Sequence, residues 1–266
     1  MKVKLVAIDL DDTLLNPGLE ISPGCAAAIR AAREKGVRVT LATGRMYQSA
    51  LPYAQQLGVD IPLITYQGAL VKSSSSEDIL YYKPLPRQAA REVMNILKDM
   101  GIHYHTYFQD DLYMDNLTPE GRAYLELAGV RPVIVDDLIE TLQCKESIKI
   151  LAIIKDEIQA ERTEQILKNI YGSSLNITRS KPYFLEIMNC KANKAIALQV
   201  IAQHYNIERG EVLAIGDSYN DLEMIQWAGI GVAMGNARKR VKEIADFVTL
   251  TNEEEGVAQA LYKYVL

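Results

Sequence analysis

The feature that most constrains the fold is the segment VKLVAIDLDDTLLN at residues 3–16, where an apolar run ends in a group of acids. Five of the six residues in VKLVAI are apolar, which is typical of a parallel strand that is buried on both faces. Asp9, Asp11 and Asp12 follow this run. Carboxylates so close together repel one another, and burying them is costly. The segment therefore predicts a buried strand that ends at a site needing a positively charged partner.

The first and last thirds of the chain alternate predicted strands with predicted helices. SPGCAAAIRAAREKG predicts a helix with Ser22 as its N-cap and Gly36 as its stop. VRVTLAT and PLITY predict the next two strands, and a helix between them runs to Gly58, with Pro52 as a bend or a later start. Near the C-terminus, EVLAIGD, GIGVAM and FVTL predict further strands. Repeated strand–helix units favour an α/β fold with a parallel sheet covered by helices.

The middle of the chain has a different pattern. IHYHTYF and LYMDN predict a hairpin that turns near Asp110, and helices and further strands follow. This mixture predicts an α+β domain inserted into the α/β domain. We place the insertion at residues 84–186 and the core domain at residues 1–83 and 187–266.

Composition excludes several classes of partner. The net charge is −5 and the one basic stretch, ARKRVK at residues 237–242, predicts a solvated helix face, so nucleic acid is not an expected partner. Cys25, Cys144 and Cys190 are odd in number and lack the spacing of metal ligands, which favours reduced thiols. No apolar run approaches the roughly 18 residues of a membrane span, so we expect a soluble, cytoplasmic protein.

Polar side chains gather where the predicted strands end or the next helix begins. They are Asp9, Asp11, Thr43, Lys194, Asp217 and Asp221. In parallel α/β sheets, ligands bind beyond the carboxyl ends of the strands. Oxygen-rich sites suit Mg²⁺, a carboxylate can attack a phosphoryl group, and hydroxyl or ammonium donors can stabilise the charge that develops. This pattern predicts a magnesium-dependent site for phosphoryl transfer.

Four of these segments resemble, in order, the motifs of haloacid dehalogenase-like (HAD) phosphatases. They are DLDDTLL, TGR, the lysine in KAIAL and GDSYND. The resemblance covers the whole chain and implies a Rossmann-like core. The insertion resembles the type IIB cap of the Cof-like subgroup, which implies that it selects the substrate.

The resemblance also implies roles for individual residues. It implies that Asp9 is the nucleophile and that Asp11 is the general acid and base. For the metal it implies Asp217, Asp9, the backbone carbonyl of Asp11 and supporting contacts from Asp221. For the substrate phosphate it implies Thr43, Gly44, Arg45, Lys194 and Asn220, with Gly44 leaving room for the phosphate to approach the backbone.

The resemblance is incomplete at three positions. Asp12 stands where the first motif usually has glycine, a substitution that we expect to be tolerated. Gln67 stands where Cof-like proteins often have asparagine, so a role for Gln67 near the substrate is a hypothesis. Lys191 competes with Lys194 for the third motif, and the frame K-x-x-A-L favours Lys194.

Other polar residues have alternative interpretations. Arg45 contacts the substrate or pairs with a carboxylate of the core, and the sequence leaves both open. His103 and His105 lie on one face of a predicted strand, but a zinc site lacks a third and fourth ligand. Arg179 and Tyr183 are equally well explained as substrate contacts or as surface residues.

Together these features predict a Mg²⁺-dependent phosphatase acting on small phosphorylated metabolites such as sugar phosphates, nucleotides or cofactor phosphates. A phosphomutase or phosphotransferase on the same core is an alternative, as is a non-catalytic sensor of phosphorylated metabolites. The presence of Asp11 disfavours the sensor, because a sensor needs no acid or base. A receiver domain is set aside because it lacks a large insertion. We expect a monomer or a small homo-oligomer.

Overall fold

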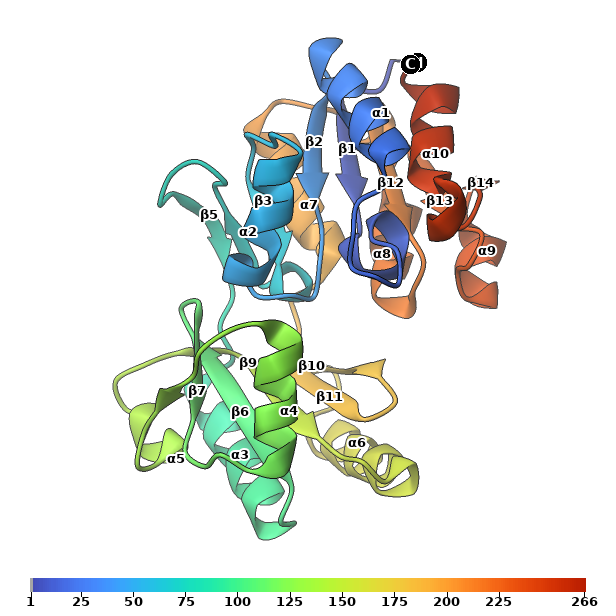
Figure 1. Cartoon of the computed structure of the whole chain (residues 1–266). Coiled ribbons are helices and arrows are strands. Elements are labelled where there is room, and N and C mark those ends of the chain that lie inside the picture. Colours follow the sequence, from blue (N-terminus) through green and yellow to red (C-terminus); the bar gives the residue numbers. More distant parts are fainter. Residues whose placement is uncertain (1) are drawn as a thin grey trace. The chain divides into compact units, whose positions relative to one another are not determined.

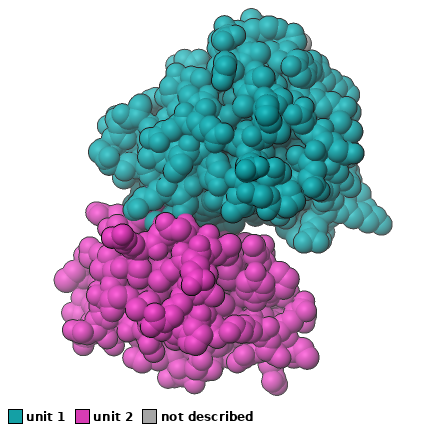
Figure 2. Space-filling view, in the orientation of Figure 1, with its two compact units in different colours: residues 1–82, 193–266 teal, residues 83–192 magenta. Residues whose placement is uncertain are grey.

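The computed structural model describes residues 2–266, which form the two compact units coloured in Figure 2. The core unit contains the residues up to Tyr82 together with Asn193–Leu266, and the inserted unit contains Lys83–Ala192. The predicted end of the insertion at residue 186 falls inside strand β11 (Phe184–Asn189). Because β11 pairs with strands of the inserted unit on both sides, the inserted unit continues past residue 186 to Ala192.

A five-stranded parallel sheet forms the centre of the core unit, in the order β14-β13-β12-β1-β2. Its strands are β1 (Leu5–Ile8), β2 (Arg38–Leu41), β12 (Val212–Gly216), β13 (Ile230–Ala233) and β14 (Phe247–Val248). All four residues of β1 are buried. This burial follows from the position of β1 between β12 and β2, and it confirms the buried parallel strand predicted from the apolar run.

A second sheet of three antiparallel strands lies beside β2. It contains β3 (Leu63–Thr65), β4 (Leu70–Lys72) and β5 (Ile79–Tyr82). A single parallel bridge between Ala42 and Ile64 joins β3 to the end of β2. The predicted third parallel strand therefore lies next to β2, but its main partner is the antiparallel β4.

Helices pack against the strands of the core unit. They are α1 (Pro23–Glu34), α2 (Tyr47–Gln56), α7 (Lys194–His204), α8 (Leu222–Trp227), α9 (Lys239–Ile244) and α10 (Gly256–Tyr264). α1 contacts α10, and α7 contacts α8; Figure 1 shows α1 in front of the sheet and α7 behind it. Ser22 caps α1 as predicted, because its side chain accepts a hydrogen bond from Cys25 N. Pro52 lies inside α2 rather than at its start.

The inserted unit is an α+β fold with a six-stranded sheet in the order β10-β11-β9-β6-β7-β8. Its strands are β6 (His103–Phe108), β7 (Asp111–Met114), β8 (Val133–Ile134), β9 (Ser147–Ile153), β10 (Leu175–Lys181) and β11. Its helices are α3 (Arg87–Asp99), α4 (Pro119–Ala128), α5 (Leu138–Thr141) and α6 (Glu157–Tyr171). An apolar cluster joins α3, α5 and α6 to the sheet through residues such as Val93, Leu138, Ile150 and Leu167. Within residues 2–266, none of the helices is long and apolar enough to cross a membrane.

Candidate active site

Three adjacent parallel strands bring predicted site residues to one edge of the core sheet (Figure 1). Asp9 directly follows β1, Asp217 directly follows β12, and Thr43 lies shortly after β2. The Asp9 backbone N–H donates to Ile215 O at 3.0 Å, which continues the pairing of β1 with β12 beyond the end of β1. The position of these residues follows from parallel topology, because the carboxyl ends of all three strands lie at the same edge.

Asp9, Asp217 and Asp221 form one buried acidic cluster. Each offers a carboxylate oxygen, and these oxygens lie within 4.8 Å of one another. Lys194, at the first position of α7, lies between two of them: its Nζ donates to Asp9 Oδ1 at 2.5 Å and to Asp221 Oδ1 at 2.6 Å. The Lys194 side chain is completely buried. The structure therefore brings four predicted residues together.

Burial and mutual repulsion shift the pKa values of this cluster. Burial, followed by the charge of Asp221, raises the pKa of Asp9 well above its ordinary value, although Lys194 acts in the opposite direction. The same two causes raise the pKa of Asp217 to about 7. Burial alone would lower the pKa of Lys194, but the charges of Asp221 and Asp9 outweigh it and raise that pKa. With three carboxylates and one ammonium, the cluster has an excess of negative charge that a bound cation would relieve.

Both oxygens of Asp221 are already engaged by the protein. Oδ1 accepts from Lys194, and Oδ2 accepts the backbone N–H groups of Asp217 at 3.1 Å and Ser218 at 3.0 Å. Gly216 allows this turn, because a Cβ there would lie 2.5 Å from Asp221 Cγ. Asp221 therefore fixes the turn that carries Asp217.

Asp9 and Asp217 each accept a side-chain hydrogen bond through only one carboxylate oxygen. Asp9 uses Oδ1 for Lys194, and Asp217 uses Oδ1 for the Thr13 hydroxyl at 2.9 Å. In the part of the chain that the structure describes, Oδ2 of these two residues accepts no hydrogen bond. Two carboxylate oxygens with spare acceptor capacity in a negatively charged site fit a hard cation such as Mg²⁺.

The Asp11 side chain lies outside the acidic cluster and pairs with Arg45. Arg45 Nε lies 3.1 and 2.9 Å from the two carboxylate oxygens of Asp11, and Nη2 lies 2.6 Å from Oδ1. Burial alone would lower the pKa of Arg45, but the hydrogen bonds and charge of Asp11 raise it. Of the two interpretations of Arg45, the structure shows pairing with a carboxylate. Its contact with substrate, and the backbone carbonyl of Asp11 as a metal ligand, stay predictions.

The residue after Asp11 has an unusual backbone conformation. Asp12 has a φ of 57°, in the left-handed region that glycine favours. Aspartate tolerates this region better than most residues, because its short polar side chain can form local hydrogen bonds. The conformation gives a physical reason for the glycine that the resemblance implies at this position, and Asp12 adopts the same conformation.

Thr43 and Gly44 form a turn that packs against Gln67. Thr43 is fully buried, and its hydroxyl accepts the backbone N–H of Arg45 at 3.1 Å. A Cβ on Gly44 would lie 2.3 Å from Gln67 Nε2, so the Gln67 side chain occupies the space beside Gly44. That Gly44 also leaves room for a phosphate to approach the backbone stays a prediction.

The Tyr66–Gly68 turn lies at the site, and the sequence predicts only part of it. Tyr66, Gln67 and Gly68 have φ values of 50°, 55° and 94°, so three successive residues are left-handed. At a non-glycine residue this conformation costs on the order of 1–3 kcal/mol and is often found at functional sites. Gln67 Oε1 accepts a hydrogen bond from Asn220 Nδ2 at 2.9 Å, which places Asn220 beside the same turn. A glycine after a strand signals a turn, but not the strain in the residues before it.

The remaining candidate residues lie outside the acidic cluster. Lys191 is exposed, whereas Lys194 is in the cluster, which agrees with the preference for Lys194. In the inserted unit, Arg179 pairs with Glu164 at 2.7 Å and Tyr183 is partly exposed.

The two histidines of the inserted unit take part in a chain of hydrogen bonds. His103 contacts Thr118 at 2.8 Å, and His105 contacts Tyr107 at 3.2 Å. Burial lowers the pKa of both histidines. Among residues 2–266, the acidic cluster of the core unit is the one group of three or more side chains spaced like metal ligands, so the two histidines do not form such a group.

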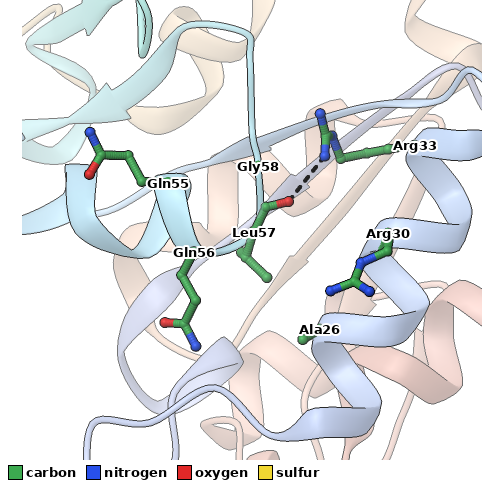
Figure 3. A pocket seen from close by; sticks show the side chains of 7 residues that line it. All are labelled: Ala26, Arg30, Arg33, Gln55, Gln56, Leu57 and Gly58. Carbon is green, nitrogen blue, oxygen red and sulfur yellow. Dashed lines mark hydrogen bonds between the residues drawn. The ribbon is translucent and has the colours of Figure 1, made fainter.

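A surface pocket of the core unit lies between α1 and the end of α2 (Figure 3). Its volume is about 300 Å³. Arg33 of α1 reaches across to donate to Leu57 O at 3.1 Å. None of the residues lining this pocket belongs to the acidic cluster or to the turns around it, so this pocket is separate from the candidate active site.

Comparison with known proteins gives consistent matches over the whole chain. A family model of haloacid dehalogenase-like hydrolases matches residues 6–261. Two Bacillus subtilis proteins, the 5-amino-6-(5-phospho-D-ribitylamino)uracil phosphatases YcsE and YitU, are 34% and 32% identical; the alignments cover 99% of this chain and 96% and 98% of theirs. The crystal structure of a haloacid dehalogenase-like hydrolase from Bacteroides thetaiotaomicron is 33% identical, with a TM-score of 0.89 over 98% of this chain and 99% of that one.

Proposed function

The chain belongs to the haloacid dehalogenase-like hydrolase family, and we propose that it is a Mg²⁺-dependent phosphatase that uses Asp9 as its nucleophile. As a phosphoric monoester hydrolase, it cleaves the bond between a phosphoryl group and an alcohol. One observation carries the proposal: Asp9, Asp217 and Asp221 lie within 4.8 Å of one another and Lys194 bonds two of them. This arrangement supports the proposal, because the proposed nucleophile Asp9, the candidate metal ligands and the proposed phosphate-binding Lys194 are close neighbours.

The proposed reaction has two steps. Asp9 attacks phosphorus, the ester bond breaks, and Asp11 gives its proton to the departing alcohol oxygen. A water molecule then attacks the phosphorus of the aspartyl-phosphate and gives a proton to Asp11, which releases inorganic phosphate and restores Asp9. Lys194 and the Thr43 hydroxyl donate to phosphoryl oxygens throughout. Because Arg45 holds both oxygens of Asp11, this ion pair must open before Asp11 can donate a proton.

Asp9 and Asp217 would hold the metal, since each has an oxygen without a hydrogen bond inside the described range of residues. Thr13 orients Asp217, and the turn fixed by Asp221 positions it. A bound Mg²⁺ would supply positive charge beside the transferring phosphoryl group. The oxygen-only donor set fits Mg²⁺ better than zinc, which prefers nitrogen and sulfur ligands in proteins.

The relatives support a proposal for the substrate class. YcsE and YitU are named as phosphatases of 5-amino-6-(5-phospho-D-ribitylamino)uracil, a compound that carries its phosphate on a ribityl group. We propose that this chain likewise acts on small phosphorylated metabolites, with sugar and polyol phosphates and cofactor phosphates as the first group to test. The inserted unit is the proposed source of specificity.

The test is release of inorganic phosphate from a panel of esters, with Mg²⁺ and with a chelator. Metal-dependent release from small esters supports the proposal. Transfer of the phosphoryl group to a sugar hydroxyl without free phosphate identifies a phosphotransferase instead. Binding of esters without release or transfer identifies a sensor.

Asp11→Asn is expected to slow hydrolysis according to how much the leaving group needs a proton. For an alkyl phosphate, we expect kcat to fall by about 10²- to 10⁴-fold, the usual contribution of a general acid or base. For p-nitrophenyl phosphate, whose leaving group departs without a proton, the burst of p-nitrophenol in the first turnover should persist. Rapid-quench kinetics measure the first turnover of each substrate. If Asp11→Asn slowed the first turnover of the alkyl phosphate and of p-nitrophenyl phosphate equally, Asp11 would be excluded as the acid.

Asp217→Asn is expected to remove the response to Mg²⁺ and to flatten the pH dependence of stability. Burial and Asp221 raise the pKa of Asp217 from 3.8 to about 7, so the folded protein keeps a proton that the unfolded chain has lost. Without metal, the free energy of unfolding should therefore fall as the pH rises through this window. Because the proton must leave before a cation binds, the affinity for Mg²⁺ should weaken below about pH 7.

Urea unfolding at several pH values, with chelator and with Mg²⁺, measures both effects for the native protein and for Asp217→Asn. The variant should lose the stabilisation by Mg²⁺ and should not be less stable without metal, because its amide oxygen can still accept from Thr13. Stabilisation by Mg²⁺ that is equal in both proteins would contradict the assignment of Asp217.

A further inference from the structure

Gln67 contacts the segments on two sides of the candidate active site. Its backbone N–H donates to Thr43 O at 3.1 Å, and its side-chain Oε1 accepts from Asn220 Nδ2 at 2.9 Å. The neighbouring Tyr66 N–H donates to Arg45 O at 2.9 Å. The Tyr66–Gly68 turn therefore joins the Thr43–Arg45 segment to the turn that carries Asn220 and Asp221.

On its third side, the Tyr66–Gly68 turn lies close to the N-terminus of α7. A Cβ on Gly68 would lie 2.2 Å from Asn193 O and 2.9 Å from Lys194 N. Asn193 caps α7, since its side chain accepts from Ile196 N at 2.7 Å. One short turn thus contacts the segments that hold Thr43, Lys194 and Asp221.

The Gln67 side chain is buried and has little freedom. It is 4% exposed, its amide packs against Gly44, and its backbone is held in the left-handed region by the flanking contacts. Burying a polar side chain and straining its backbone both cost free energy, so a residue that only filled space here would more favourably be apolar and unstrained. The Gln67 amide accepts a hydrogen bond from Asn220 on one side and packs against Gly44 on the other. An apolar side chain could not accept the hydrogen bond.

We propose that Gln67 is a positioning residue of the phosphatase. It fixes the Thr43 hydroxyl relative to the Asn220–Asp221 turn, and it acts through these residues rather than by touching the reacting atoms. Gln67 is also coupled to position 44, because a Cβ there would force the Gln67 amide to move. This inference rests on the proposed function for its kinetic readout, but the coupling between Gly44 and Gln67 can also be measured without activity.

The first test compares Gln67→Asn with Gln67→Ala. Asparagine adopts the left-handed region more readily than glutamine and keeps the amide, but it is one methylene shorter. We expect Gln67→Asn to keep or raise the midpoint of thermal unfolding and to lower kcat about 10- to 100-fold, as expected for a misplaced reacting group. Gln67→Ala should lower kcat similarly. Gln203→Ala, an exposed position on α7, is the control and should change neither quantity.

A purely structural role predicts a different result. In that case kcat would follow stability, and Gln67→Asn would be as active as the native protein. Native kcat in Gln67→Asn would therefore overturn the inference, as would a native kcat in Gln67→Ala.

The second test is a double-mutant cycle with Gly44→Ala. If the Gln67 amide makes glycine necessary, Gly44→Ala should lower the midpoint of thermal unfolding in the native background and much less in the Gln67→Ala background. If glycine is needed only for a phosphate, Gly44→Ala should have the same effect in both backgrounds, which would overturn the coupling. Because this readout needs no turnover, it separates failure of the inference from failure of the proposed function, which would appear as no phosphate release by the native protein.

Discussion

Asp9→Asn is expected to lower the release of inorganic phosphate by roughly 10³- to 10⁶-fold, the range expected when a covalent nucleophile is removed. The amide has no charge with which to attack phosphorus. The fold should persist, because the asparagine oxygen has the same position as Asp9 Oδ1 and can accept from Lys194. Burial and Asp221 raise the pKa of Asp9, so this variant also removes an unfavourable buried charge, and its metal-free form should be no less stable than the native protein.

Asp60→Asn is the matched control for this change. Asp60 is an exposed acid of the same core unit, and it lies 3.6 Å from Arg33. Its substitution should leave phosphate release unchanged. Substantial turnover by a folded Asp9→Asn protein would exclude Asp9 as the nucleophile.

Lys194→Met is expected to cause a large loss of stability. The substitution leaves Asp9 and Asp221 buried and without their shared cation, and breaking a buried ion pair in this way typically costs about 3–5 kcal/mol. Mg²⁺ should restore part of the free energy of unfolding, because, bound by Asp9 and Asp217, it would supply positive charge to the same acidic cluster. Phosphate release should remain lost, since no ammonium group contacts the phosphoryl oxygens.

The chain contains a second buried lysine that serves as the control for the effect of Mg²⁺. Lys149 lies 3.2 Å from Glu186 in the inserted unit, and both side chains are almost completely buried. Lys149→Met should therefore also be destabilising, but Mg²⁺ should not restore its stability. Urea unfolding with and without Mg²⁺ measures all three proteins, and equal recovery in both variants would show that the metal does not act at the Asp9 cluster.

Much of the fold could be predicted because apolar patterning specifies local structure. The continuous apolar run before Asp9 became the buried strand β1, and the hairpin predicted near Asp110 is formed by β6 and β7. The C-terminal boundary of the insertion was harder to predict from the sequence. Four of the six residues of β11 are apolar, which suits a buried strand of either unit, and only the pairing of β11 with β9 and β10 assigns it to the inserted unit.

The acidic cluster could be predicted for a topological reason. Parallel strands place their carboxyl ends at one edge, so acids at the ends of β1 and β12 must lie close together. The pairing of Asp11 with Arg45 could not be assigned, because the sequence offers Arg45 several carboxylates. The strained conformation of Gln67 also could not be predicted from the sequence. Glutamine disfavours left-handed backbone, and only tertiary contacts impose it here.

The most direct test of the account is a search for the covalent intermediate. The native protein would be mixed with Mg²⁺ and a substrate from the ester panel, quenched in acid within the first turnover, digested and analysed by mass spectrometry. The proposed mechanism predicts a phosphoryl group on Asp9 in the native protein and in Asp60→Asn, and none in Asp9→Asn. Rapid phosphate release with an unmodified Asp9 peptide, or a phosphoryl group on another residue, would contradict it.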